Sequence, residues 1–481
     1  MIPQKLRDIP IVQIATPQIV VSNDEPDALF EVRKKIQPRA VDGYFARWRW
    51  AFVWLTQIVF YGLVWMPWNG RQAVLFDLGA RKFYILGYVF WPQDFIYLTA
   101  LLVISACSLF LFTAVGGRLW CGYACPQTVY TEIFLWIERR IEGDRTRRMR
   151  LDEAPMSLRK FALKAAKHAA WVALALWTGF TFVGYFTPID ALMRDVMTLD
   201  VGGWAAFWLL FYAFATYGNA GWMREQVCKY MCPYARFQSV MFDQDTMIVT
   251  YDQARGEQRG ARSRKADVRA QGLGDCVDCT LCVQVCPTGI DIRDGLQYEC
   301  IGCAACIDAC DQVMDKMGYA RGLIRYSTSN ALAKGWDRAR MWRRVLRPRV
   351  LIYSGVLLLL VAGTAASLYW RTPLKVDVLR DRASLMREVE DDQIENVYRV
   401  QIMNTQEMAH RYRISVSGLE SLIVVGNEEV DMPAATTRQV PVRVRMHKGF
   451  ADKGSHRILV HVQAIDDPRI AAVEDSVFLI R

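Results

Sequence analysis

Residues 118–126 read RLWCGYACP, and residues 224–233 read REQVCKYMCP. Both stretches contain C-x-x-x-C-P, and each one closes a long apolar run. Because residues four apart share a helical face, each pair of thiols is able to bind a soft metal ion at a kink fixed by the proline. The repeat predicts an internal duplication whose thiols meet near a pseudo-twofold axis; the alternative is cysteines without a ligand role. The pairs are Cys121 with Cys125, and Cys228 with Cys232.

Composition indicates a membrane protein. The chain has 481 residues, of which 53% are hydrophobic and 22% are charged. A helix needs about 20 apolar residues to cross a bilayer, and five stretches approach or exceed that length. No short apolar core with a cleavage site precedes them, so we expect a polytopic α-helical membrane protein without a removable signal peptide. The predicted spans are residues 51–68, 95–115, 168–187, 201–220 and 350–370.

Lysine and arginine predict the orientation, because basic residues beside a span tend to stay in the cytoplasm. They are frequent before the first span, in loop 116–167 and before the last span. We therefore expect a multi-pass protein of the bacterial inner membrane whose N-terminus and segment 221–349 are cytoplasmic. The net charge of +10 then serves membrane anchoring, and no nucleic-acid partner is expected.

The predicted domains follow from these spans. They are a cytoplasmic tail (1–49), a membrane domain with the duplicated motif (50–223), a cytoplasmic region (224–349) with a ferredoxin-like part at about 270–320, a last transmembrane helix (350–370) and a periplasmic domain (371–481).

All thirteen cysteines lie between positions 107 and 310, which argues against a disulfide framework. Eight of them form C-x2-C-x2-C-x3-C twice, in CVDCTLCVQVCP and CIGCAACIDAC. Such runs hold two 4Fe-4S clusters in ferredoxins, where the fourth cysteine of each run ligates the other cluster. Zinc knuckles are the alternative. The predicted ligand sets are Cys276, Cys279, Cys282 and Cys310 for one cluster, and Cys300, Cys303, Cys306 and Cys286 for the other.

Two details of the cysteine pattern lead to separate expectations. Pro287 follows the first run, but Asp311 stands in the equivalent place after the second run, so the turn there is expected to differ without loss of a ligand. Cys107 lies inside the second predicted span, between small residues, and is expected to be a packing residue.

The C-terminal region changes to short runs with period-two alternation, separated by Gly, Asn, Asp and Pro. This pattern predicts an all-β, immunoglobulin-like sandwich, here without cysteines and therefore without a disulfide. Four histidines lie in it, two of them near methionines. Exposed strand residues are the favoured interpretation, and copper ligation is the alternative. The residues are His410, His447, His456 and His461, with Met408 and Met446.

The combination of GRLWCGYACPQTVYTEIF, CKYMCPYARFQ, the paired ferredoxin runs and a last span with an outer β domain resembles the CcoG/FixG/RdxA family of cytochrome c oxidase accessory proteins. The resemblance covers nearly the whole chain. It implies a membrane-bound iron–sulfur protein that reduces Cu(II) to Cu(I) for assembly of cbb3-type cytochrome c oxidase. The implied copper-reducing thiols are Cys121, Cys125, Cys228 and Cys232.

The resemblance also implies cofactors and partners. Two 4Fe-4S clusters are the cofactors, and copper is a substrate or a transient ligand. The implied partners are the lipid bilayer, a cytoplasmic electron donor, and oxidase subunits or copper chaperones and transporters; a homodimer is left open. The chemistry agrees, because thiolates favour Cu(I) over Cu(II) and iron–sulfur clusters carry single electrons.

Two other functions stay open from the sequence. One is a quinol dehydrogenase of the NapH type, similar to the membrane ferredoxin subunits of periplasmic nitrate reduction. His168 is the only histidine near the membrane, so a bis-histidine haem site is not expected. The other is a non-catalytic scaffold that stabilises oxidase assembly intermediates.

Overall fold

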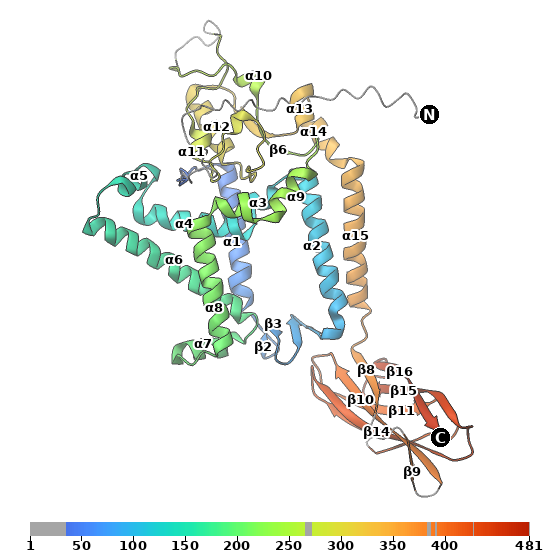
Figure 1. The fold of residues 1–481 in the computed structure, drawn as a ribbon. Helices are drawn as coiled ribbons and strands as arrows, with labels where there is room; N and C mark the ends of the chain where they lie inside the picture. The colour runs from blue at the N-terminus through green and yellow to red at the C-terminus, as the bar shows by residue number, and fades with distance from the viewer. Residues whose placement is uncertain (1–34, 265–271, 382–385, 390–391, 427, 481) are drawn as a thin grey trace, which may run out of the picture. The chain divides into compact units, whose positions relative to one another are not determined.

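The computed structural model describes residues 35–264, 272–381, 386–389, 392–426 and 428–480 (Figure 1). Most of the predicted N-terminal tail therefore lies outside the described residues. A helix overlaps each of the five predicted spans. The helices up to residue 241 are α1 (Tyr44–Leu63), α2 (Phe95–Gly116), α3 (Leu119–Tyr123), α4 (Pro126–Glu142), α5 (Arg145–Glu153), α6 (Leu158–Gly184), α7 (Ile189–Thr198), α8 (Gly203–Thr216) and α9 (Pro233–Met241).

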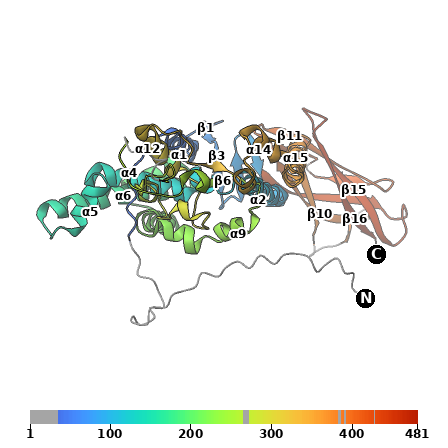
Figure 2. The ribbon, with the colours of Figure 1, turned by 90° about the horizontal axis from the view of Figure 1, so that it is seen from above.

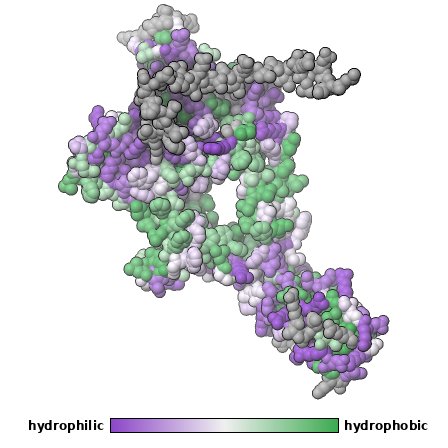
Figure 3. All heavy atoms as spheres, in the orientation of Figure 1, coloured by the Kyte–Doolittle hydropathy of each residue, from purple (hydrophilic) through white to green (hydrophobic). Residues whose placement is uncertain are grey.

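Two of the described helices are long and apolar enough to cross a membrane. They are α2 with the turn before it (Pro92–Gly116) and α15 (Pro348–Tyr369). The two helices pack side by side, with Tyr97 Oη 3.0 Å from Ser367 Oγ, and hydrophobic residues cover their visible surface (Figure 3). Apolar side chains facing outward along both helices are what a lipid environment requires.

The other three predicted spans are not confirmed. Helices α1 and α6 carry arginine and lysine in their first turns, so neither meets the apolar requirement as a whole. Helix α8, extended by a π-helical turn (Tyr217–Met223), meets it only together with α7, and that pair is bent by 93°. The structure therefore supports two spans by composition, or three if the bent pair is one span.

Helices α6 and α8 form the tightest contact of the helical region. A methyl group added at Gly179 of α6 would stand 2.3 Å from the carbonyl oxygen of Leu209 in α8, so only glycine permits this approach. Between α1 and α2 the chain forms short antiparallel strands. These are β1 (Pro67–Trp68), β2 (Arg71–Gln72), β3 (Val74–Asp77), β4 (Lys82–Ile85) and β5 (Tyr88–Phe90).

The cysteine runs lie in a small α/β region. Strands β6 (Ile248–Tyr251) and β7 (Ile324–Ser327) pair antiparallel, and a core that includes Val249, Met314 and Leu323 packs between them and the cysteine loops. The helices of this region and the following connection are α10 (Gln253–Gly256), α11 (Leu281–Gln284), α12 (Ala305–Met317), α13 (Ser329–Lys334) and α14 (Arg338–Arg343).

The C-terminal region is a sandwich of two antiparallel sheets, as the alternation predicts. One sheet has the order β12–β14–β10–β8, with β9 on β10, and the other has the order β13–β11–β15–β16. Alternate residues of the long strands point into one apolar core. The strands are β8 (Leu374–Arg380), β9 (Arg387–Val389), β10 (Gln393–Asn404), β11 (His410–Ser417), β12 (Ile423–Val425), β13 (Glu429–Met432), β14 (Thr437–His447), β15 (Gly454–Ala464) and β16 (Ala471–Ile480).

Candidate metal centre

The two cysteine runs fold into loops with the same unusual backbone conformation. Asp278 and Thr280 flank the second cysteine of the first run with φ of 54° and 56°. At the equivalent places of the second run, Gly302 and Ala304 have φ of 68° and 59°. Positive φ is disfavoured for residues other than glycine, and such strain collects at functional sites. Its repetition at matching positions indicates two equivalent binding loops.

Each loop encloses a small cavity ringed by thiols. One cavity is lined by Cys276, Cys279, Cys282 and Cys310. The other is lined by Cys282, Cys286, Cys300, Cys303 and Cys306. The structure thus brings each predicted ligand set around one cavity, with a fourth cysteine from the other run, while Cys282 borders both.

These cavities fit an iron–sulfur cluster by their donors and burial. Burial raises the pKa of the Cys282 thiol to about 12 and that of Cys303 to about 11. Both thiols are therefore protonated at neutral pH until a metal displaces the proton. A set of four sulfur donors in an apolar pocket is what a 4Fe-4S cluster uses, and the cluster supplies one-electron transfer when bound.

Asp311 changes the turn after the second run, as expected. In the first run, α11 ends at Gln284 and Pro287 follows. In the second run no proline interrupts the chain, and α12 continues to Met317. Asp311 instead accepts a hydrogen bond of 2.9 Å from the backbone N–H of Gly322, next to β7.

The two C-x-x-x-C-P motifs share one feature and differ in another. Cys125 and Cys232 each cap a helix that begins at the following proline, α4 and α9 respectively. Proline suits this first helical position because its fixed φ is already helical and no N–H is lost from the ladder. The first cysteine, however, lies in the α-helical α3 in the first motif and in a π-helical turn (Val227–Met231) in the second.

The four thiols of the motifs lie close enough to influence one another. Burial raises the pKa of the Cys121 thiol to about 12, and the neighbouring Cys125, Cys228 and Cys232 add to this rise. Cys121 Sγ also lies 3.3 Å from Gln238 Oε1 in α9, so the first motif contacts the second half directly. Within the described ranges, no three His, Cys, Asp or Glu side chains come close enough to hold a single metal ion.

Two buried arginines join the halves of the duplication reciprocally. Arg118 of the first half donates to the carbonyl oxygen of Ala235 in α9, and Arg224 of the second half pairs with Glu138 in α4 at 2.7 Å. Gln127 of α4 also donates to the Arg224 carbonyl at 3.0 Å. Neither arginine was predicted to be a functional residue, although each lies shortly before the cysteines of its motif. The sequence feature that could have identified them is an arginine three or four residues before the first cysteine of each motif.

Glu138 anchors a buried charge network beneath the second motif. It pairs with Arg148 and Arg224, both at 2.7 Å, and Arg224 and Lys167 lie over the ring of Trp171. Burial alone would raise the pKa of Glu138, but Arg224 and its cationic neighbours hold that pKa below its ordinary value. The carboxylate is therefore ionised at neutral pH and orients the segment that leads to Cys228.

The first motif contacts the loop of the second cysteine cavity. A methyl group added at Gly122 would stand 2.9 Å from the carbonyl oxygens of both Ile301 and Gly302. Only the absence of a side chain lets α3 approach this loop so closely. Arg49 of α1 donates to the Cys303 carbonyl at 2.6 Å from the other side. Cys121 is thus the neighbour in sequence of a residue that lies against a cluster-type loop.

Helix α1 is also tied to the cysteine region (Figures 1 and 2). The carboxylate of Asp308 in α12 accepts hydrogen bonds from the N–H groups of Phe45 at 3.1 Å and Ala46 at 2.8 Å, which caps α1. An added methyl group at Gly43 would stand 2.3 Å from this carboxylate, so the cap requires glycine there.

The histidines show no copper site among the described residues. His168 lies 3.0 Å from Tyr217 Oη. His410 is buried, so its interpretation as an exposed strand residue is wrong; its two ring nitrogens lie 2.6 Å from Asp466 and 2.5 Å from Gln406. His447, His456 and His461 each have a hydrogen-bond partner as well.

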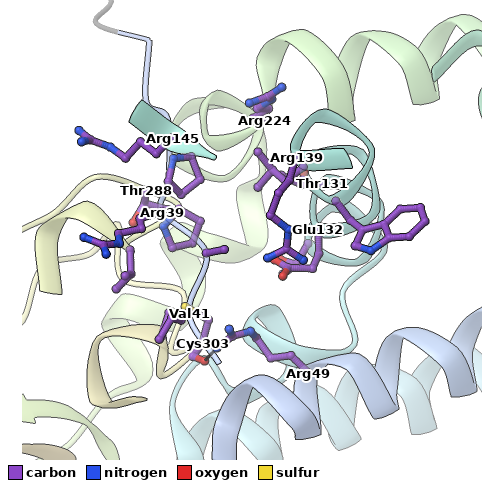
Figure 4. Close-up of a pocket in the computed structure, with 18 of the residues that line it drawn as sticks. Arg39, Val41, Arg49, Thr131, Glu132, Arg139, Arg145, Arg224, Thr288 and Cys303 are labelled. Atoms are coloured by element: carbon purple, nitrogen blue, oxygen red, sulfur yellow. Dashed lines mark hydrogen bonds between the residues drawn. The ribbon is translucent and has the colours of Figure 1, made fainter. Parts of the chain in front are cut away.

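A cavity of about 740 Å³ lies beside both metal-type sites (Figure 4). Cys303 and Ile301 of the second cysteine loop line it, as does Cys228 of the second motif. Seven arginines and four acidic residues line the rest. No local sequence pattern predicts this cavity, because its arginines come from four separate segments.

Comparison with known families defines the class of this protein. A family model of a 4Fe-4S dicluster domain matches residues 223–329, and a 4Fe-4S binding domain matches residues 98–143. A third model, described as the IG-like fold at the C-terminus of FixG, matches residues 364–481. The chain is therefore an iron–sulfur protein with ferredoxin-type domains and a C-terminal immunoglobulin-like domain.

Whole-chain relatives give the family. Nitrogen fixation protein FixG of Rhizobium meliloti is 41% identical over 85% of this chain and 82% of its own. Protein RdxB of Cereibacter sphaeroides is 39% identical over 82% and 84%, and protein RdxA of the same organism is 36% identical over 87% and 90%. The chain belongs to the FixG/RdxA family, which confirms the resemblance seen in the sequence.

Proposed function

We propose that this protein is a membrane-bound cupric reductase that passes single electrons from its iron–sulfur region to Cu(II) held by the C-x-x-x-C-P thiols. The observation that carries the proposal is the contact of Gly122 with Ile301 and Gly302, which puts the first motif against the second cysteine loop. Electron transfer needs such close approach between donor and acceptor sites. The resident groups would be two 4Fe-4S clusters, held by the two interleaved ligand sets.

The thiols suit the substrate. Cu(II) takes up one electron to become Cu(I), and soft sulfur ligands stabilise the product ion. The first motif also reaches the second half of the duplication, since Cys121 Sγ lies 3.3 Å from Gln238 Oε1 in α9. Cu(I) delivered to assembly of a cbb3-type oxidase is the use that the sequence resemblance implies.

Copper reduction can be tested directly on the purified protein. The protein is prepared without oxygen, its iron is quantified, and Cu(II) is added to the reduced protein with a Cu(I)-specific chelator. Replacing Cys121 and Cys125 together with Ser, or Cys228 and Cys232 together, should lower Cu(I) formation by at least about tenfold, because a hydroxyl does not stabilise Cu(I). Iron content should not change.

Cys107→Ser is the matched control, since Cys107 is a cysteine of α2 outside both motifs. It should reduce copper like the parent. Parental rates in both double variants would show that the motif thiols are not the site. Loss of iron in them would instead favour the scaffold function, and quinol-dependent reduction without copper reduction would favour the quinol dehydrogenase.

The proposed location is the bacterial inner membrane, with the ferredoxin-type region in the cytoplasm and the C-terminal domain in the periplasm. Helices α2 and α15 support it by length and composition. A reporter that is active only outside the cytoplasm should work when fused after Arg481 and fail when fused at Gly260. Activity at Gly260 would invert the orientation.

A further inference from the structure

The arginine-lined cavity borders one thiol of the proposed copper site, Cys228, but its arginines have no role in that site. Its charge is the first reason: seven arginines line it, and Arg148 and Arg224 pair with Glu138. The other five arginines against four acidic residues leave an excess of positive charge, which favours an anion. Figure 4 shows Arg39 and Arg145 on one side of the cavity and Arg139 on the other, with Cys303 and Arg49 at one end. An anion bound among these residues lies beside the second cysteine loop.

Several of these guanidinium groups have no acidic partner. Arg49 and Arg145 donate to backbone carbonyls, of Cys303 and Gln37 respectively. The side chains of Arg39 and Arg139 make no ion pair or hydrogen bond with any described residue. Arg39 is exposed and Arg139 and Arg145 are half-buried, so an anion in the cavity can reach guanidinium groups that no carboxylate neutralises. The planar forks of these groups match phosphate oxygens in particular.

The rest of the cavity suits an organic body larger than the anionic group. A volume of about 740 Å³ falls within the range of small-molecule and cofactor sites. Trp50 of α1, Leu135 of α4, and Val285 and Ile301 of the cysteine region provide apolar and aromatic surface along the cavity. A free phosphate would leave most of this space and surface unused.

We propose that this cavity binds a phosphate-bearing flavin of the flavin mononucleotide type, as the electron donor for the neighbouring cysteine loop. The role of the flavin as electron donor rests on the proposed function, whereas the binding of the flavin does not. A flavin fits because it can release its electrons singly, whereas a nicotinamide transfers a hydride. The flavin hydroquinone loses two electrons and two protons; each of two Cu(II) ions takes one electron, and the protons pass to water.

The test measures binding without copper. The iron-loaded protein in phosphatidylcholine nanodiscs is titrated with flavin mononucleotide, and quenching of flavin fluorescence reports the bound fraction. The parent should show one saturable site. The double variant Arg39→Gln with Arg139→Gln should bind at least about tenfold more weakly, because it loses charge-assisted hydrogen bonds to phosphate. Riboflavin, which lacks the phosphate, should bind weakly and equally to both proteins.

Arg147→Gln is the matched control, because Arg147 is an exposed arginine of α5 outside the cavity. It should bind like the parent, and all variants should keep their iron. Equal affinity of parent and double variant would overturn the proposal. So would loss of flavin binding in nanodiscs that contain phosphatidylglycerol, since a lipid phosphate would then be the occupant.

The outcome separates the two proposals. Flavin binding that depends on the arginines, without copper reduction, would retain the cavity assignment and reject the cupric reductase. Copper reduction without flavin binding that depends on the arginines would retain the cupric reductase and reject the cavity assignment.

Discussion

The two C-x-x-x-C-P segments share the pattern C-x-Y-x-C-P and differ in their surroundings. The first lies on the α-helical α3, whose Gly122 touches the second cysteine loop. The second lies on a π-helical turn, and its Cys228 borders the arginine-lined cavity. A duplicated motif has thus been placed in two environments, one against the loop of a cluster-type site and one beside the arginine-lined cavity. The local motif carries the thiols, and the neighbouring segments decide what each pair lies against.

The largest expected effect is the loss of iron when one cluster-type site is disrupted at a time. Cys279→Ser removes a thiol from the cavity of the first cysteine run. Cys303→Ser removes a thiol from the cavity whose loop contacts the first C-x-x-x-C-P motif. Each change should lower the iron content from about eight to about four per chain, because one 4Fe-4S cluster is lost. Iron analysis and electron paramagnetic resonance measure this. Iron near four in the parent would contradict the two-cluster assignment.

The next effect is a loss of stability that is specific to the second C-x-x-x-C-P segment. Glu138→Gln leaves Arg148 and Arg224 without their carboxylate, and breaking a buried ion pair costs about 3–5 kcal/mol. Denaturant unfolding should show the loss of stability. Backbone hydrogen exchange should rise in the π-helical turns and stay unchanged in α3.

Glu153→Gln, at an exposed position of α5, is the control for that change. It should alter the free energy of unfolding by less than about 0.5 kcal/mol. Equal increases in hydrogen exchange in both segments would show that the network does not distinguish them.

The smallest effect is specific to the first segment. Gly122→Ala forces a methyl group against the carbonyls of Ile301 and Gly302, which should cost about 1–3 kcal/mol and separate α3 from the loop. Oxidation of the reduced protein by Cu(II), followed by stopped-flow absorbance, should become slower. Gly218→Ala is the control change, in the π-helical turn that precedes the second segment, where nothing lies within 4 Å of the added methyl. Similar oxidation rates in both variants would show that electron transfer does not depend on the contact between Gly122 and the second cysteine loop.

Much of the local structure could be predicted because it depends on neighbours in sequence. The alternation after residue 371 became the two-sheet sandwich, and the prolines after Cys125 and Cys232 open helices as expected. Span prediction was less successful. Charges in the first turns of α1 and α6 leave too little apolar length, although both stretches are helical.

The sequence by itself determined which residues can hold metal and roughly where each domain lies, since ligand chemistry and apolar length are properties of short segments. Only the tertiary structure decided that Arg118 and Arg224 cross between the halves, that Gly122 meets Ile301, and that a set of distant arginines lines one cavity. These contacts join residues about a hundred or more positions apart. No local pattern specifies them, because they arise from how whole helices and loops pack against each other.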